Sequence, residues 1–268
     1  MLKDARGAIA YDEEGSGPTI LFVPGSWATG SAWRGVADAL RGRFRLVTTS
    51  LLGYGGTQER RSAADCSIER QAEMLEAVVR RAGHPLHVVA HSYGGLVCLA
   101  VAMRGAVPLA SLTVIEPVAF GLLEQAGEPE LNQQFTTARA RYFHAFESGD
   151  GQAARWIIDF FAGDGTFDGL PPRMRDHIVA TTPTHYFDMR TGFDPPLSAH
   201  ADLSVPMLIL KGDRTHPALA RSAEILSHAA PNASLVTVAG ASHFMIATHP
   251  SDVAELVAGH ISKSTTPA

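Results

Sequence analysis

Short runs of consecutive apolar residues alternate along the chain with segments in which apolar residues recur at helical spacing. The apolar runs predict strands at residues 19–23, 44–49, 86–90, 112–115, 207–210 and 235–238. The segments with helical spacing predict helices over residues 33–40, 68–82, 218–229 and 252–261. Strands that are apolar throughout are typical of a sheet buried on both faces. The alternation therefore predicts an α/β fold with a mostly parallel central sheet and helices on both faces.

A long stretch between two of the predicted strands interrupts this alternation. From residue 120 to about residue 203 the sequence contains no convincing sheet strand, favours helices and is rich in aromatic side chains. We interpret this stretch as a helical cap inserted over the carboxyl edge of the sheet. The predicted organisation is one α/β domain in two parts, residues 1–119 and 204–268, with the cap over residues 120–203. The tail over residues 262–268 is expected to fray.

The sequence around Ser92 predicts a sharp strand–turn–helix with a serine at its apex. An apolar run at 86–90 leads into the turn, and a helical run at 95–103 leads out of it. Ala90 and Gly94 stand two positions to either side of Ser92, where so tight a turn leaves room only for small residues. The turn aims the first free N–H groups of the helix at whatever bonds to the serine oxygen. This pattern is typical of a nucleophile elbow, although such a short string alone also occurs by chance.

Composition narrows the possible functions. The chain has 268 residues, of which 46% are hydrophobic and 18% charged, which suits one large α/β domain. Its net charge is −5 and its basic residues are scattered, which argues against a nucleic-acid surface. No signal segment or membrane span is predicted from its apolar runs. The two cysteines, Cys66 and Cys98, form neither a disulfide framework nor a metal-binding motif, so we expect a cytoplasmic protein without a bound metal.

Two loop motifs resemble those of the α/β-hydrolase superfamily, and the resemblance extends over roughly residues 7–262. The segment at 22–27 is similar to that family's oxyanion loop, with Pro24 in place of the usual histidine and with Gly25 retained. The segment at 240–244 is similar to the loop that carries the family's catalytic histidine. The resemblance implies the α/β-hydrolase fold, with a helical cap, for this chain.

The chemistry of the residues indicates the reacting groups. Ser92 is a weak nucleophile unless a base takes its proton during the attack, and histidine is the natural base near neutral pH. Of the twelve histidines, His243 follows the last predicted strand and precedes the last helix, which places it beside Ser92 at the carboxyl edge of the sheet. His91 is next to Ser92 in sequence but is expected to point away from it, in a structural role.

The resemblance also implies how the oxygen of a reacting carbonyl is held. The backbone N–H groups of Ser26 and Tyr93 are expected to form an oxyanion hole, in which one such donor can lower the barrier by ~3 kcal/mol. Trp27, next to the first of these donors, is expected to line the substrate pocket or to pack on its own loop.

The acidic partner of His243 is not at the position that the resemblance implies. In most of the superfamily a carboxylate stands three residues after a glycine that ends one of the later strands, but here Gly212 is followed at that distance by Thr215. Two carboxylates could substitute: Glu116, at the end of the strand that follows the elbow helix, and Asp213. We favour Glu116, because some members carry the acid on that strand and a glutamate has the extra methylene to reach across. Asp213 could equally cap its turn.

We therefore expect a serine hydrolase that cleaves a carboxylic ester of a small to medium apolar substrate through an acyl-enzyme on Ser92, without a cofactor. The same residues could serve a C–C bond hydrolase, a lactonase or a thioesterase. A non-hydrolytic ligand-binding protein on this scaffold is the alternative that Thr215 favours. An aspartate nucleophile would indicate a dehalogenase or an epoxide hydrolase, and Ser92 argues against both. The expected partner is a small-molecule ester, with no nucleic acid and no membrane, and a homodimer is left open.

Overall fold

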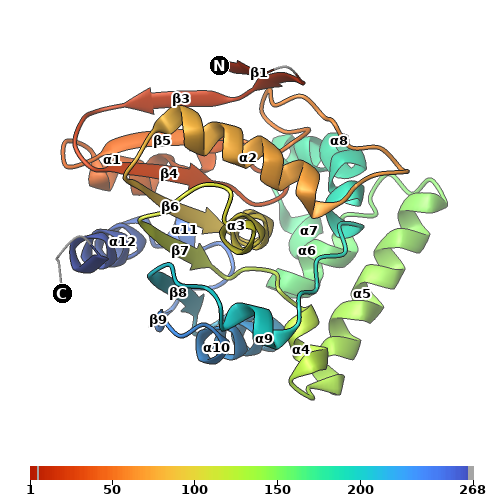
Figure 1. The fold of residues 1–268 in the computed structure, drawn as a ribbon. Helices are drawn as coiled ribbons and strands as arrows, with labels where there is room; N and C mark the ends of the chain where they lie inside the picture. Colours follow the sequence, from red (N-terminus) through yellow and green to blue (C-terminus); the bar gives the residue numbers. More distant parts are fainter. Residues whose placement is uncertain (5, 265–268) are drawn as a thin grey trace.

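The structure is a computed structural model that describes residues 1–4 and 6–264, and its centre is a seven-stranded sheet (Figure 1). The strands of this sheet are β3 (Tyr11–Glu14), β4 (Thr19–Val23), β5 (Arg45–Thr49), β6 (Leu86–His91), β7 (Ser111–Ile115), β8 (Met207–Gly212) and β9 (Ala233–Val238). Their order is β3-β5-β4-β6-β7-β8-β9, and every neighbouring pair is parallel except β3 with β5. A separate antiparallel pair is formed by β1 (Leu2–Asp4) and β2 (Gly7–Ile9).

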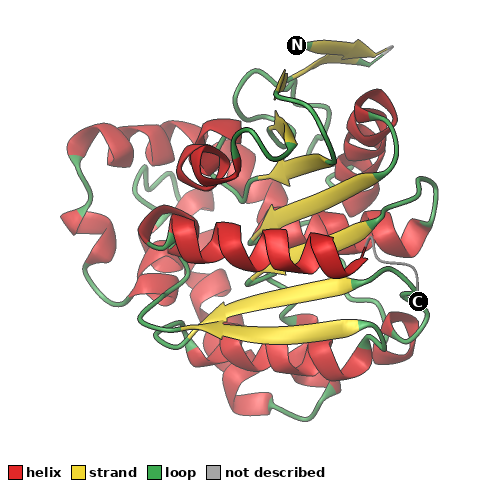
Figure 2. Cartoon of the chain, turned by 90° about the vertical axis from the view of Figure 1, so that its left-hand side faces the viewer, coloured by secondary structure: helices red, strands yellow, loops and turns green. Residues whose placement is uncertain are grey.

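Helices cover both faces of the sheet, as Figures 1 and 2 show. One face packs against α2 (Ile68–Ala82), α3 (Tyr93–Arg104) and α10 (Pro217–Ala229). The other packs against η1 (Gly30–Trp33), α1 (Arg34–Leu40), α11 (Met245–Thr248) and α12 (Pro250–Ser264). Side chains of β4 alternate between the two, since Leu21 and Val23 join the first core and Ile20 and Phe22 the second. Strands β4, β6 and β7 are buried along their whole length, which explains their mostly apolar sequences.

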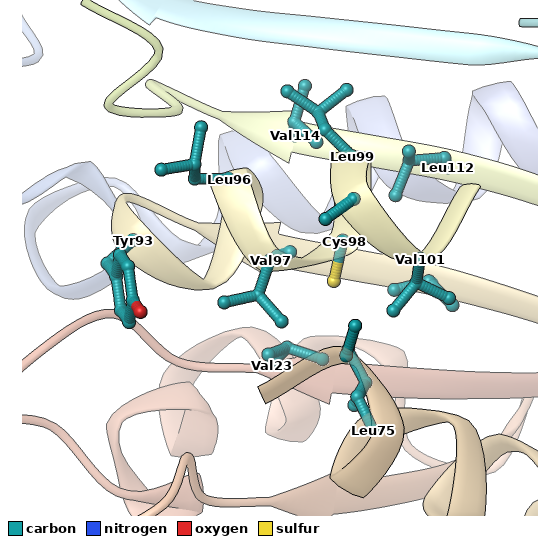
Figure 3. Close-up of a cluster of buried hydrophobic side chains, with 14 of the residues drawn as sticks. Val23, Leu75, Tyr93, Leu96, Val97, Cys98, Leu99, Val101, Leu112 and Val114 are labelled. Carbon is teal, nitrogen blue, oxygen red and sulfur yellow. The ribbon is translucent and has the colours of Figure 1, made fainter. Parts of the chain in front are cut away.

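The helix α3, which begins directly after Ser92, is the most deeply buried helix next to the sheet. Its side chains are apolar on every side and pack between α2 and the strands. Figure 3 shows Leu99 beside Val114 of β7, with Val97 on the side of Val23 and Leu75. Fully burying one such side chain stabilises the fold by about 1.5–3 kcal/mol. The packing therefore fixes the start of α3, and with it the turn at Ser92.

Between β7 and β8 the chain forms helices only. These are α4 (Gly121–Gln125), α5 (Pro129–Glu147), α6 (Arg155–Ala162), α7 (Thr166–Gly169), α8 (Pro172–Met189) and α9 (Leu197–His200). All of residues 120–203 are described, and no strand occurs among them. The segment, called the helical insertion below, has small cores of its own around Tyr142 and Phe167. These cores account for part of its aromatic content.

The structure differs from the sequence predictions at the two ends of the chain and at Trp33. Strand β3 has no apolar pattern in the sequence, because Tyr11 is followed by three acidic, exposed residues on the edge of the sheet. The helix predicted from Trp33 begins as a 3₁₀ turn ending at that residue. Helix α12 continues to Ser264, so fraying from Ser262 is wrong for these first residues, and residues 265–268 lie outside the described part. None of the described helices combines the length and the apolar character needed to cross a bilayer.

Candidate active site

The order of the strands places a crevice at the carboxyl ends of β4 and β6. Strand β5 lies on one side of β4 and β6 on the other, so the connections that leave β4 and β6 diverge. Ligands of open α/β sheets bind in the crevice at such a switch point. The loop with Gly25 and Ser26 follows β4, and Ser92 follows β6, so both of these predicted site segments border the crevice.

Ser92 sits in a strained turn that the neighbouring loop approaches closely. Its backbone has φ 55° and ψ −124°, a left-handed φ that non-glycine residues rarely adopt. A Cβ atom at Gly94 would lie 2.3 Å from the carbonyl oxygen of Pro24, and one at Gly25 would lie 2.9 Å from the Cβ atom of Ser92. Both contacts would clash, so glycine at these two positions lets the loop after β4 lie directly against the serine.

A continuous chain of hydrogen bonds links Ser92, His243 and Glu116. The Nε2 atom of His243 lies 3.0 Å from the Ser92 hydroxyl oxygen, and its Nδ1 atom lies 2.8 Å from Oε2 of Glu116. An ionised carboxylate only accepts hydrogen bonds, so Nδ1 carries the ring proton and Nε2 is left to accept from the serine. The structure thus brings together the three residues that were favoured from the sequence, and the imidazole is in the tautomer that a general base needs.

Glu116 reaches His243 from the end of β7, and the end of β8 with the loop after it stabilises its charge. The Glu116 side chain is fully buried, and its backbone has φ 44°. Besides the imidazole, its carboxylate accepts the Gly212 N–H at 2.8 Å and the Thr215 hydroxyl at 2.7 Å. Donors of this kind offset the cost of burying a carboxylate. Asp213 instead is exposed and accepts the Gly240 N–H at 2.8 Å, which is a turn-capping contact.

Two rings hold the imidazole of His243 in place. The Phe161 ring, from α6 of the helical insertion, stacks on it with centroids 4.7 Å apart and planes 19° apart. The His91 ring lies at the same centroid distance, tilted by 38°, and its Nε2–H donates to the carbonyl oxygen of His243 at 2.8 Å. Burial, together with the proximity of His243, lowers the pKa of His91 to about 3. His91 is therefore neutral near pH 7, and its hydrogen bond stabilises the loop that carries His243.

Two backbone amides next to Ser92 are available to a ligand. Within the described residues, neither the Ser26 N–H nor the Tyr93 N–H donates a hydrogen bond to another protein group. Tyr93 is the first residue of α3, where the N–H groups lack helical partners and carry the positive end of the helix dipole.

A cavity of about 900 Å³ opens above Ser92, between the sheet edge and the helical insertion. Most of its wall is apolar, with aromatic and aliphatic side chains from both parts of the chain, among them Leu96, Val118, Phe120, Phe135, Phe161 and Met189. Trp27 also lines it and stacks on His185 of α8, with ring centroids 3.7 Å apart. The volume is near the upper end of ordinary small-molecule sites.

The sequence reasoning missed a buried charged cluster beside this cavity. Asp188 of α8 accepts hydrogen bonds from Arg61, Tyr54 and Ser26, and the Arg61 side chain is completely buried. Arg61 follows Glu59 and Arg60 in a charged run that is typical of a solvated surface, and its partner is 127 residues away. No local spacing could have linked them.

The described residues hold no group of three or more histidine, cysteine or acidic side chains arranged to bind a metal ion. Both cysteines are free, with Cys98 buried in α3. Burial raises the pKa of the Cys98 thiol, which makes it a poor nucleophile.

Comparisons with known proteins agree with the fold. The model of the alpha/beta hydrolase family matches residues 20–256. Haloalkane dehalogenase 2 of Mycobacterium tuberculosis is 34% identical over 103 residues, which are 38% of this chain and 36% of that protein. The pimeloyl-[acyl-carrier protein] methyl ester esterase of Methylococcus capsulatus is 34% identical over 105 residues, 39% of each chain. These matches thus span little more than a third of the relatives' length.

Among solved structures, a thermophilic esterase from Thermogutta terrifontis aligns with a TM-score of 0.75 over 98% of this chain and 97% of that one. Its sequence is 22% identical, so the likeness shows the fold alone.

Proposed function

Because the chain belongs to the alpha/beta hydrolase family, we propose that it is a serine hydrolase that cleaves carboxylic esters through an acyl-enzyme on Ser92. The observation that carries the proposal is the unbroken chain of hydrogen bonds from Glu116 through His243 to Ser92. Acyl transfer needs a serine with a positioned base and an acid that orients the base. Ser92 and His243 line the mostly apolar cavity, and Glu116 lies buried behind His243.

The reaction follows from the positions of these atoms. The Ser92 oxygen attacks the ester carbonyl carbon while His243 Nε2 takes the serine proton, and Glu116 stabilises the resulting imidazolium. The carbonyl oxygen becomes negative and is bound by the N–H groups of Ser26 and Tyr93. When the C–O bond breaks, the imidazolium gives its proton to the leaving alcohol. Water then attacks the acyl-enzyme, with His243 again as base, and releases the acid and the free serine.

The wall of the cavity supports an apolar substrate of small to medium size. Most of the cavity wall is apolar, although polar residues such as Ser26, His91 and Asp188 also line it. One relative is named as a methyl ester esterase, which agrees with ester cleavage by this chain. The volume of about 900 Å³ also leaves room for a larger acyl group than the smallest test esters carry.

Dehalogenation, the activity in the name of another relative, does not fit Ser92. Displacement of a halide by an aspartate forms an ester on the enzyme, which water can cleave. Displacement by a serine would form an ether, which this site has no means of hydrolysing. The nucleophile at the elbow therefore favours acyl transfer over carbon–halogen cleavage.

The test is covalent labelling with a fluorophosphonate, followed by turnover of a panel of p-nitrophenyl esters of increasing acyl length. We expect one label, on Ser92, and Ser92→Ala should lose both labelling and turnover. Ser242→Ala is the matched control, since it removes a neighbouring hydroxyl and should keep both. Persistent labelling of the Ser92→Ala protein, or a label on Ser26 or Ser242, would refute the proposal. Thioester and lactone substrates in the same panel distinguish the related acyl-transfer reactions.

A further inference from the structure

We infer that Asp188, on helix α8 of the helical insertion, is a positioning residue for the oxyanion hole. It binds the side-chain hydroxyl of Ser26, and it thereby fixes the direction of the Ser26 backbone N–H. The inference rests on the proposed function, because an oxyanion forms only if Ser92 attacks a carbonyl. It assigns to the insertion a part in the reaction itself, beyond shaping the cavity.

The carboxylate of Asp188 accepts short hydrogen bonds and is buried from solvent. Its Oδ2 accepts the Ser26 hydroxyl at 2.6 Å and the Tyr54 hydroxyl at 2.7 Å, and its Oδ1 accepts Arg61 at 2.5 Å. Only 5% of Asp188 is exposed. Burial raises its pKa, and Arg61 and the two hydroxyls limit the rise. Hydrogen bonds to an ionised carboxylate are about twice as strong as neutral ones, so the Ser26 hydroxyl has one fixed partner.

The loop that carries Ser26 needs such support. Trp27, the next residue, has φ 59°, a left-handed conformation that persists only where the surroundings hold it. Helix α8 holds it at two further points, since His177 Nε2 lies 2.9 Å from the Trp27 carbonyl oxygen and the His185 ring stacks on the indole. Positions 177, 185 and 188 lie within about 80° of one another around an ideal helix. One face of α8 thus lies along the loop.

A second explanation is that Asp188 only fastens the insertion to the core. Its partners come from the loop after β4, the loop after β5 and the segment at Arg61, all of them in the core. The two explanations differ in what they predict for the reaction. If Asp188 only holds the insertion against the core, its loss lowers the stability of the protein or weakens substrate binding. Loss of positioning weakens binding of the oxyanion, which exists in the transition state and not in the bound ester.

The first experiment compares Ser26→Ala with Ser26→Thr. Ser26→Ala removes the hydroxyl and leaves the backbone N–H, so we expect kcat to fall by roughly tenfold, less than the 10²–10³-fold loss for a deleted donor, with KM within about twofold of wild type. The affinity for an aryl trifluoromethyl ketone, which forms an oxyanion on Ser92, should fall by the same factor as kcat/KM. Ser26→Thr keeps a hydroxyl and should restore most of both.

The second experiment uses two variants, each of which neutralises one of the two carboxylates that pair with Arg61. Asp188→Asn alters the partner of Ser26, whereas Glu59→Gln alters the other carboxylate that binds Arg61 and does not contact Ser26. We expect Asp188→Asn to lower kcat as Ser26→Ala does, and Glu59→Gln to leave kcat and KM unchanged. Because the two act through one hydrogen bond, Ser26→Ala combined with Asp188→Asn should lose no more than the larger single loss.

Several results would overturn the inference. One is an unchanged kcat and ketone affinity in Ser26→Ala, with only a higher KM or a lower melting temperature. Another is an equal loss of kcat in Glu59→Gln. If Asp188→Asn does not fold, the Ser26 pair decides alone. Failure of the proposed function is recognised separately, because the Ser92→Ala protein would then keep its turnover and its label.

Discussion

The neighbouring strands β7 and β8 each lead into a carboxylate at the same edge of the sheet, and the two carboxylates differ in almost every respect. Glu116, after β7, is fully buried and accepts three hydrogen bonds, one of them from His243. Asp213, after β8, is exposed, and its side chain accepts a hydrogen bond from the backbone of Gly240. What distinguishes them is their position relative to the imidazole, not their place near the end of a strand.

The loop after β8 donates a hydrogen bond to the carboxylate that binds His243 and does not carry this carboxylate itself. In most of the superfamily it would supply the acid, and the residue at that position here is Thr215, whose hydroxyl donates to Glu116 at 2.7 Å. Gly212, the last residue of β8, donates its N–H to the other carboxylate oxygen. The end of β7 therefore supplies the charge, and the end of β8 with the loop after it supplies donors that offset the cost of burying this charge.

Removing the charge of Glu116 should have the largest effect. Glu116→Gln keeps the size of the side chain but leaves the imidazole without a carboxylate to fix its tautomer, so kcat should fall by about 10⁴-fold. The measurement is steady-state hydrolysis of the best p-nitrophenyl ester, with circular dichroism and the melting temperature as the control for folding. A loss below tenfold in a folded protein would show that Glu116 is not the acid.

A carboxylate returned to the loop after β8 should recover part of that loss. The Thr215 hydroxyl lies 2.7 Å from the Glu116 oxygen that binds His243, so an aspartate at position 215 brings a carboxylate close to Nδ1. In the Glu116→Gln background, Thr215→Asp should raise kcat by roughly 10–100-fold, since it restores a charge but with imperfect geometry. Thr215→Asn in the same background is the uncharged control and should recover nothing. An equal recovery by both variants would contradict the electrostatic explanation.

The sheet and the elbow could be predicted because their signals are local. Continuous apolar runs marked β4 and β6, and small residues around Ser92 marked the turn that Gly94 makes possible. Strand β3 gave no such signal, since an edge strand with one solvated face carries little apolar pattern. His243 could be proposed from its place after the last strand alone.

Two features of the site could not be predicted from the sequence: which carboxylate binds His243, and the charged cluster at Asp188. Both are contacts between residues that are far apart in the sequence. Glu116 and Asp213 both follow strands at the correct edge, and only the fold shows which one faces His243. In the sequence, Asp188 and Arg61 each look like solvated surface charges. In the structure, Asp188 on α8 forms a buried ion pair with Arg61. Side-chain pairing across more than a hundred residues leaves no periodicity in a single sequence.

Thr215→Val should show what the hydroxyl donor in the loop after β8 contributes. The variant leaves one oxygen of a buried carboxylate with one partner fewer, and hydrogen bonds to charged groups contribute about 1.5–3 kcal/mol. We expect the free energy of unfolding in urea at pH 7 to fall by that amount, with a much smaller effect on kcat than Glu116→Gln has. Thr215→Ser keeps the hydroxyl and should stay close to wild type. Equal stability of the two variants would mean that Thr215 does not stabilise the Glu116 charge.

His91, the last residue of β6, is buried like Glu116 but carries no charge. The pKa of His91 is lowered to about 3 in the folded protein, against about 6.5 when unfolded, so only the unfolded state takes up a proton between these values. Stability from this residue is complete above pH 6.5 and is lost as the pH falls towards 3. Between pH 7 and pH 5, wild type should lose about 2 kcal/mol more than His91→Gln, measured by urea unfolding. Parallel losses in the two proteins would contradict this.

Asp213→Asn should have the smallest effect, and it completes the comparison between β7 and β8. An asparagine side chain still offers an oxygen to the Gly240 N–H, which donates to Asp213 in the wild-type protein. We expect kcat and KM within about twofold of wild type and a change in unfolding free energy below about 0.5 kcal/mol, as for most surface substitutions. Asp213→Ala, which removes the acceptor, should cost about 1 kcal/mol of stability and still leave kcat unchanged. A loss of kcat approaching that of Glu116→Gln would mean that the loop after β8 still supplies the acid during turnover. The hydrogen bond between Glu116 and His243 would then describe only the resting protein.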